Sequence, residues 1–300
     1  MLSLRPTDTG QRQFHSYMLG AIAPRPIAFV STIDQSGNPN VSPFSFFNAM
    51  GTNPPILVFS PSRSGRTGKT KNTYDNILEV PEAVVNVVTV SMVHQASLAS
   101  GEYPKGVNEF EKAGFTQLPS ELVRPFRVKE SPVQMECKIR DTVETGKGGG
   151  AGIIVIAEIL LIHLEETILG TDGLIDPDKI QLAGRMGSDF YCNASGTSLF
   201  RIPQPGPVLG IGIDALPDQI RTSSYLTGKH LAQLASVNSL PEYFDNASIK
   251  KNIAPLGYIK KGKIPVNREK QFYRKIIRLL DEGNTTGAWK FILKTLPDEN

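Results

Sequence analysis

The stretch PRPIAFVSTIDQSGNPNVSPFSFFN, residues 24–48, decides the fold of this chain. Two runs rich in β-branched and aromatic residues, 24–34 and 40–48, flank the turn signal QSGNP at 35–39. A third run, PILVFS, follows at 55–60. Apolar runs of this length, bounded by Gly, Pro, Asn and Ser, are typical of antiparallel strands joined by a hairpin and short loops. The stretch therefore predicts a mainly β domain.

A cluster of hydroxyl groups, glycines and cations follows the third run. Residues 61–73 read PSRSGRTGKTKNT and contain four Lys or Arg residues, just before a predicted helix at 74–80. The free N–H groups and the dipole of a helix N-terminus favour an anion, and hydroxyl and cationic side chains add further donors. Lys71 and Thr73, at the helix start, would be costly to bury without an anion. The segment therefore predicts a phosphate site.

Four motifs in this order, PRPIAFVST, NVSPFSFFN, PPILVFS and KNT, make the chain similar to the flavin reductase-like, FMN-binding split-barrel family, the flavoredoxin-like proteins. The resemblance runs from about residue 18 to residue 203. It implies a mainly β fold with α additions, an FMN-binding split β-barrel, and NADH or NADPH as the co-substrate. The family usually has KDT where this chain has KNT at 71–73. Because Asn caps a helix about as well as Asp, we expect the same geometry with a different local charge.

The resemblance implies three groups of flavin-binding residues. Donors at the edge of the flavin ring would be Ser45, Phe46, Phe47 and Asn48; residues flanking the ring or the ribityl chain would be Arg25, Ser31 and Thr32; and the phosphate would lie among Ser60, Ser62, Arg63, Lys71 and Thr73. Ordinary core packing is the alternative for the two phenylalanines. No residue is predicted to be catalytic.

The segment 182–191, LAGRMGSDFY, matches the family in residue type where the chain passes close to the flavin. A cation beside reduced, anionic FMN would stabilise it and raise its potential. We expect Arg185 to take this role, the alternative being that Arg185 pairs with a surface carboxylate and Tyr191 lies in the core.

A flavin site needs few acids or bases from the protein. The isoalloxazine ring itself accepts hydride, so the protein must hold the ring, donate hydrogen bonds to its polar edge and anchor the phosphate. Other kinds of site have little support in the sequence. The four histidines form no H-x-x-x-H or H-E-x-x-H pattern, and both G-x-S-x-G and G-x-G-x-x-G after a strand are absent.

Two long predicted strands, 132–145 and 152–164, flank the glycine-rich segment GKGGG at 146–150. A strand rather than a helix follows these glycines, so they predict a flexible hairpin tip rather than a phosphate loop. A strand with one face in water would alternate apolar and polar residues, but the second strand is apolar on both faces. We therefore expect the barrel interior on one side and a helix or a second subunit, in a homodimer, on the other.

Residues 105–115, KGVNEFEKAGF, resemble the mobile arm that lies beside the flavin in the family; a surface connection is the alternative.

The composition of the 300 residues limits the class of protein. The net charge of +3 comes from 32 basic and 29 acidic residues, which does not indicate a nucleic-acid-binding protein. Cys137 and Cys192 are the only cysteines and form no C-x-x-C pair, which favours a reducing compartment. The N-terminus lacks the apolar segment of a signal peptide, and the most apolar run, 153–162, is too short to span a bilayer. We expect a cytoplasmic protein with no membrane partner.

A change of composition separates the last third of the chain. The segment PQPGP at 203–207 indicates a linker. The sequence therefore predicts a split-barrel flavin-binding domain over 1–205 and a helical extension over 206–300. In the extension, an amphipathic stripe is expected at Phe272, Ile276, Leu279 and Leu280, with Asn267 and Gly283 at the helix ends. The basic run 250–278 would bind nucleic acid or the extra phosphate of NADPH, or else form a solvated helix face.

Three classes of function follow from these patterns. The leading hypothesis is an FMN-dependent oxidoreductase that passes hydride from NADH or NADPH to bound FMN and then to a small-molecule or protein acceptor. The second is a non-enzymatic electron-transfer protein of flavoredoxin type. The third is a binding module that uses the basic helical extension. Fold alone does not decide among them.

Overall fold

The computed structural model describes residues 1–202, 204, 206–207, 209–239 and 266–295. These residues belong to two compact units, Met1–Phe200 and Arg201–Asn300, which are described separately below. The division at 200/201 lies close to the boundary expected at 205/206.

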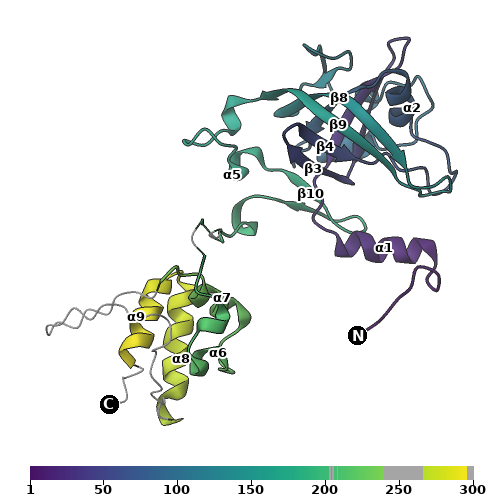
Figure 1. The fold of residues 1–300 in the computed structure, drawn as a ribbon. Coiled ribbons are helices and arrows are strands. Elements are labelled where there is room, and N and C mark those ends of the chain that lie inside the picture. The colour runs from purple at the N-terminus through teal and green to yellow at the C-terminus, as the bar shows by residue number, and fades with distance from the viewer. Residues whose placement is uncertain (203, 205, 208, 240–265, 296–300) are drawn as a thin grey trace. The chain divides into compact units, whose positions relative to one another are not determined.

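A seven-stranded antiparallel sheet forms the body of the first unit (Figure 1). Its strands are β1 (Ala28–Ile33), β2 (Pro39–Phe44), β3 (Phe47–Thr52), β4 (Pro55–Phe59), β5 (Glu82–Val87), β8 (Val133–Glu144) and β9 (Ile153–Leu164). Their order in the sheet is β2-β1-β5-β8-β9-β4-β3. The expected runs at 24–34, 40–48 and 55–60 thus become β1, β2 with the start of β3, and β4.

The two edge strands of this sheet are consecutive in the chain. Only Ser45 and Phe46 separate the end of β2 from the start of β3, so these strand ends lie no more than about 11 Å apart. The sheet must therefore curl until its two edges meet at Ser45 and Phe46, where they are not paired with each other. This open seam is the split of a split barrel, which confirms the predicted fold class.

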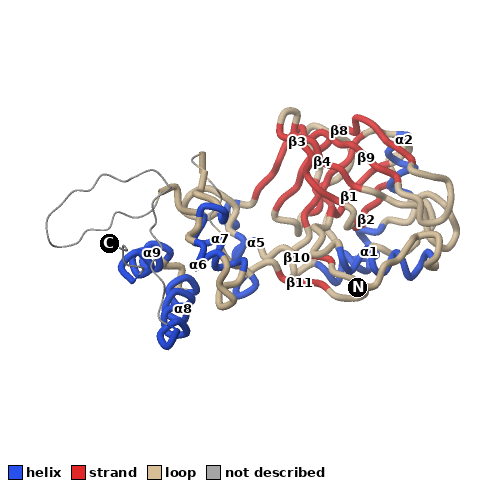
Figure 2. The backbone as a smooth tube through the Cα atoms, turned by 60° about the horizontal axis from the view of Figure 1, so that its bottom comes forward, coloured by secondary structure: helices blue, strands red, loops and turns tan. Residues whose placement is uncertain are grey.

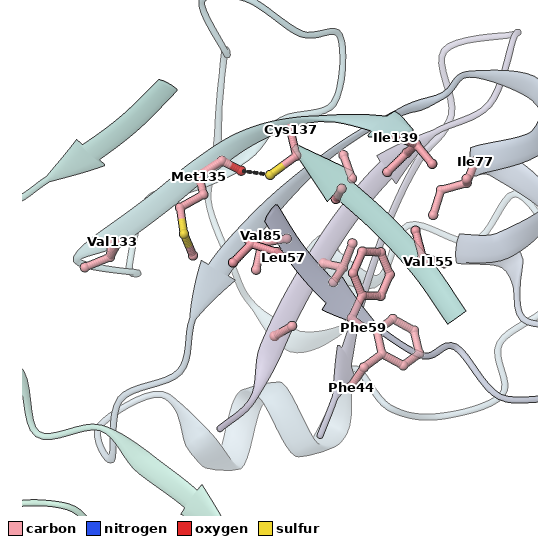
Figure 3. Close-up of a cluster of buried hydrophobic side chains, with 14 of the residues drawn as sticks. Phe44, Leu57, Phe59, Ile77, Val85, Val133, Met135, Cys137, Ile139 and Val155 are labelled. Carbon is pink, nitrogen blue, oxygen red and sulfur yellow. Dashed lines mark hydrogen bonds between the residues drawn. The ribbon is translucent and has the colours of Figure 1, made fainter. Parts of the chain in front are cut away.

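Strand β1 is buried along its whole length because both of its faces are covered. Ala28 and Val30 point into the barrel interior, where Phe44, Phe59 and Val155 from other strands also pack (Figure 3). The alternate residue, Phe29, points to the opposite face and packs against Phe115, with ring centroids 4.9 Å apart. Burial on both faces explains why this run is apolar without strict alternation.

Several helices accompany the sheet in this unit. They are α1 (Gln11–Ala21), α2 (Asn72–Glu79), α3 (Val93–Leu98), α4 (Glu109–Ala113) and α5 (Pro177–Ile180), and two small hairpins pair β6 (Gln117–Leu118) with β7 (Arg127–Val128) and β10 (Ala183–Arg185) with β11 (Tyr191–Asn193). Helix α2 inserts Tyr74 and Ile77 into the barrel core. Helix α1 lies beside the β10–β11 hairpin (Figures 1 and 2). It has no buried residue within this single chain.

Strand β9 was expected to face the barrel interior on one side and a helix or a second subunit on the other. Ile153, Val155 and Ala157 are buried in the barrel. The other face is exposed over much of its length, at Ile154, Leu160, Ile162 and Leu164. The apolar character predicted from the sequence is therefore present, but in the single chain only the interior side is covered.

The second unit is helical, as predicted for the extension. Its helices are α6 (Asp218–Arg221), α7 (Gly228–Ala235), α8 (Val266–Asp281) and α9 (Thr285–Thr295). Trp289 is fully buried, and its indole N–H donates to the Leu234 carbonyl oxygen at 2.9 Å. Along α8, the predicted stripe is confirmed: Phe272, Ile276 and Leu280 are buried, and Leu279 packs against the same core.

Some expectations for this unit lie outside the described residues. Most of the basic run, 250–265, is among them, as is the side chain of Asn267. Gly283 has a positive φ of 75° just after α8 ends, as expected for a helix C-terminus. Within the part of the chain that is described, no helix is both long and apolar enough to cross a membrane.

Candidate functional site

A cavity lies at the open seam of the barrel. It has a volume of about 210 Å³ and is lined by Ser42, Pro43, Phe44, Ser45, Phe46, Ser60, Ser62, Lys71, Ser100 and Gly101. The Ser60 and Ser62 hydroxyl oxygens are 3.1 Å apart, and Ser60 also accepts a hydrogen bond from the Ile153 N–H at 3.2 Å. The lining of the seam cavity thus combines aromatic side chains with several hydroxyl groups.

A larger cleft adjoins this cavity and shares Ser42, Lys71 and Gly101 with it. Its volume is about 780 Å³, within the range of small-molecule and cofactor sites. It is lined by Asn40, Ser42, Arg63, Ser64, Thr67, Gly68, Lys69, Thr70, Lys71, Asn72, Asp75, Gly101, Glu102, Tyr103, Pro104, Lys105, Glu109 and Lys147. Five of these residues are basic and three are acidic, so the cleft has a net positive charge.

The loop before α2 forms one wall of the cleft. It closes on itself where the Ser64 N–H donates to the Lys69 carbonyl at 2.9 Å and the Gly68 N–H donates to the Ser64 carbonyl at 2.8 Å. Gly68 has φ = 70°, a conformation that favours glycine. The sequence SGRTGK at 64–69 is thus suited to a tight, polar turn beside the cleft.

The glycine-rich tip of the β8–β9 hairpin supports this loop. The Arg63 N–H donates to the Ala151 carbonyl at 3.0 Å, and the Gly150 N–H donates to the Arg63 carbonyl at 3.2 Å. A Cβ atom at Gly149 would lie only 2.9 Å from the Gly65 carbonyl oxygen. The tip is therefore a hairpin, as expected, but it packs closely against the loop and contributes Lys147 to the cleft.

Three basic residues of the segment 61–73, Arg63, Arg66 and Lys71, are paired with carboxylates. Arg63 donates to Glu144 at 2.8 Å from one guanidinium nitrogen and to the Gly68 carbonyl at 3.3 Å from another. Lys71 and Arg66 both contact Glu102, at 3.0 and 2.6 Å. Hydrogen bonds from Lys71, Ser64 and Arg66 lower the pKa of Glu102 to about 2.

A buried polar network lies beneath the cleft, between α2 and the first two strands. Thr73 donates to the Asn40 side-chain oxygen at 2.8 Å, and Thr32 lies 3.3 Å from the same oxygen. The Asn76 amide donates to the Thr32 hydroxyl at 3.2 Å. Thr32 and Thr73 are almost fully buried and line neither cavity, so the structure places them beneath the cleft, and their contact with a flavin stays a prediction. They hold Asn40, which lines the cleft.

Glu109 is the acidic residue at the inner end of this network. It is only 2% exposed, and it accepts hydrogen bonds from the Val41 N–H at 3.3 Å and from the Asn40 amide. Burial raises the pKa of Glu109 above its ordinary value, and these hydrogen bonds offset only part of the effect.

Three other predicted residues also lie outside the two cavities. Ser31 is buried and donates to the Phe126 carbonyl on the outer side of β1. Phe47 packs against the barrel core. The exposed Asn48 accepts a hydrogen bond from the Ala49 N–H at 2.8 Å. Strand alternation and core packing thus place these side chains outside the two cavities, and their role toward a flavin stays a prediction.

Arg25 is buried and holds three segments together. Its guanidinium donates to the Leu19 and Ile22 carbonyls, at 2.8 and 2.6 Å, and so satisfies the C-terminal end of α1. It also donates to the Met186 carbonyl at 3.0 Å and to the Ser45 hydroxyl at 3.3 Å. Arg25 therefore reaches the seam cavity through Ser45 rather than lining it.

Arg185 lies next to Arg25 but faces a different group. Its backbone pairs with that of Arg25, and its guanidinium stacks over the Tyr191 ring, 4.4 Å from the centroid. Burial, and then the charge of Arg185, lower the pKa of Arg25. Arg185 lines neither cavity, and its place beside the flavin stays a prediction.

Six of the predicted residues do line the cleft or the seam cavity: Ser45, Phe46, Ser60, Ser62, Arg63 and Lys71. The sequence analysis missed Asn40, Ser42, Lys69, Glu102, Lys105, Glu109 and Lys147. A signal existed for two of them, because residues 40 and 42 are polar at alternate positions of one strand and must share a face. Among the described residues, no group of three or more His, Cys, Asp or Glu side chains could hold a metal ion.

Comparison with known proteins agrees with this geometry. The model of the flavin reductase like domain matches residues 19–179 of the chain. An uncharacterized protein from Aquifex aeolicus is 36% identical over 196 residues, which is 65% of this chain and 97% of that protein.

Two solved structures are each similar to about two thirds of the chain. Nitrilotriacetate monooxygenase component B from Bacillus cereus is 27% identical with a TM-score of 0.63, covering 67% of this chain and 98% of its own. The 2-nitrobenzoate 2-nitroreductase of Pseudomonas fluorescens is 26% identical with a TM-score of 0.60, covering 69% and 98%. Each match thus spans nearly the whole relative and about two thirds of this chain.

Proposed function

The chain belongs to the flavin reductase-like family, and from this premise we propose that it is an FMN-dependent oxidoreductase. In this proposal NADH or NADPH donates hydride to FMN bound in the cleft, and the electrons pass to a small-molecule or protein acceptor. The two solved structures named above, a monooxygenase component and a nitroreductase, favour an enzyme over a binding module.

The single observation that carries this proposal is the continuity of the seam cavity with the basic cleft. The seam offers an aromatic wall at Phe46 and hydroxyl donors, which suit a flat ring with a polar edge. The adjoining cleft offers Arg63 and Lys71, which suit a phosphate. Lys71 lines both, so one ligand with a ring at one end and a phosphate at the other fits the arrangement.

The residues present fit FMN in their chemistry. Ser45 and Phe46 would lie against the ring, Ser60 and Ser62 along the ribityl chain, and Arg63 and Lys71 at the phosphate. Bound flavin would supply the hydride acceptor. Arg25 would keep Ser45 oriented through its 3.3 Å hydrogen bond, and Asn40 would be fixed by Thr32 and Thr73. The Arg63 Nε atom is buried without a partner among the described residues.

We also propose that the protein forms a homodimer through the exposed face of β9. Leu160, Ile162 and Leu164 are each 40–45% exposed there and lie at alternate positions of one strand. A row of large apolar side chains on a sheet face is typical of a protein interface. Helix α1, which buries no residue within the chain, offers a second surface for the partner subunit.

An anaerobic absorbance experiment tests the proposed activity. Purified protein is saturated with FMN, excess flavin is removed, and the spectrum is recorded before and after addition of NADH or NADPH. We expect FMN to co-elute with the protein and its visible absorbance to bleach with at least one nicotinamide. Bound FMN that neither nucleotide bleaches would favour an electron carrier of flavoredoxin type. Failure to retain or bind FMN at all would contradict the proposal.

A further inference from the structure

A carboxylate of the protein itself pairs with a cation of the cleft, Lys71, and with the exposed Arg66. Glu102 contacts the Lys71 ammonium group at 3.0 Å and the Arg66 guanidinium at 2.6 Å, through different carboxylate oxygens. The buried Ser64 hydroxyl also hydrogen-bonds to it. An ammonium group, a guanidinium and a hydroxyl around one anion are the donors that a phosphate monoester requires.

The segment that carries Glu102 is only lightly attached to the protein. Residues 100–108 connect α3 to α4, and none of them is buried. Besides the contacts of Glu102, the Asn72 amide donates to the Tyr103 carbonyl at 3.2 Å, and Lys105 pairs with Glu79 at 2.7 Å. Gly106 has φ = 88°, a backbone conformation that glycine adopts without a steric penalty. Lifting this segment would break polar contacts at the surface without opening the hydrophobic core.

We propose that Glu102 is an internal substitute for the ligand phosphate. Without ligand its carboxylate neutralises Lys71 and Arg66, and an incoming phosphate takes over these two cations and displaces residues 100–107 from the cleft. This inference rests on the proposed function for the identity of the full ligand, FMN, but it requires only that the cluster binds a phosphate. A phosphate monoester carries about −1.5 to −2 charges at pH 7, against −1 for the carboxylate. It is therefore attracted more strongly to the two cations and can displace Glu102 from them.

The substitution Glu102→Gln tests the competition directly. We expect it to bind both inorganic phosphate and FMN at least about threefold more tightly than the wild type, because two partly exposed ion pairs no longer have to be broken. Glu130→Gln is the matched control. It removes one carboxylate charge from an exposed residue that hydrogen-bonds to the Thr116 N–H, outside the cleft, and should leave both affinities unchanged.

Hydrogen exchange of the wild-type protein provides a second measurement that does not depend on a variant. Adding inorganic phosphate should increase amide exchange in residues 100–107 while protecting residues 63–73. Equal or weaker phosphate binding by Glu102→Gln, or protection of both segments, would overturn the inference.

The outcomes also separate this inference from the proposed function. If phosphate shows the expected effects but neither protein binds FMN, the proposed function fails and the displacement of Glu102 stands. If both proteins bind FMN and phosphate with the same affinities, the proposed function stands and the displacement fails.

Discussion

The substitution Thr73→Val distinguishes two roles for a residue at the start of α2. In the structure the Thr73 hydroxyl is buried and donates to Asn40 at 2.8 Å, beneath the cleft. From the sequence alone the same hydroxyl would donate directly to a bound phosphate. Valine keeps the shape of the side chain and removes only the donor, so stability and ligand affinity should respond differently under the two roles.

The magnitudes follow from the contacts. Asn40 would keep its hydrogen bond to Thr32, so the loss is close to that of one buried hydrogen bond, about 1 kcal/mol of unfolding free energy. For a unit of this size that corresponds to a fall of about 2–4 °C in Tm. FMN affinity should change by less than about threefold. Loss of a direct hydrogen bond to a charged phosphate would instead weaken binding by about tenfold or more.

The assay must resolve the first unit, because the only tryptophan, Trp289, lies in the second. Urea unfolding is followed by far-ultraviolet circular dichroism, with tryptophan fluorescence recorded in parallel to identify the transition of the helical unit. FMN affinity is measured by fluorescence titration. Thr70→Val makes the same chemical change on a residue that lines the cleft and should change stability by less than about 0.5 kcal/mol. Unchanged stability of Thr73→Val together with tenfold weaker FMN binding would refute the reasoning.

Three further predictions concern the positive charge of Lys71, the buried carboxyl group of Glu109 and the exposed apolar face of β9. Lys71→Met should weaken FMN binding by about 10- to 100-fold, and by less at high salt, because it removes a cation that lines the cleft. The control Lys138→Met, which removes an exposed cation on β8, should leave FMN affinity unchanged. Equilibrium titration with FMN measures both variants. Burial raises the pKa of Glu109, so the folded state keeps its proton to higher pH and loses stability as pH rises through that pKa. Glu109→Gln should therefore gain unfolding free energy relative to the wild type between pH 4 and pH 8, as measured by urea unfolding at each pH; a constant difference would contradict the assignment. Ile162→Arg should convert a dimer to a monomer in sedimentation velocity with little loss of stability, since the side chain is 45% exposed in the single chain.

The sequence predicted the strands of the barrel because local patterns determine which residues are buried. The runs at 24–34 and 55–60 are apolar and bounded by turn residues, and both became strands. Pairing was not accessible in the same way, because β1 lies next to β5, β5 next to β8 and β4 next to β9 through contacts distant in the chain. The open seam at Ser45 and Phe46 follows from that pairing order, and only the resemblance to a known family placed a site there.

The predicted site residues that line neither cavity share a physical cause. The place of a residue at a helix start or on a strand determines where its Cα atom lies. Its side chain then forms hydrogen bonds with whichever polar group the tertiary packing brings near. Thr73 donates a hydrogen bond to Asn40, 33 residues earlier in the chain, and Ser31 donates one to the Phe126 carbonyl, 95 residues later. No local pattern encodes either partner, although the alternate polar residues 40 and 42 did indicate a polar face on β2.

The charge of the segment 61–73 shows the same dependence on distant parts of the chain, with a consequence for binding. Counting residues 61–73 gives four cations, but Arg63 is paired with Glu144, and Arg66 and Lys71 are both paired with Glu102. These carboxylates lie 81, 36 and 31 residues away in the chain, so composition alone overstates the charge offered to a ligand. An anion entering the cleft must compete with carboxylates already in place. Its affinity therefore depends on how readily residues 100–107 move away, as well as on the cations that first suggested the site.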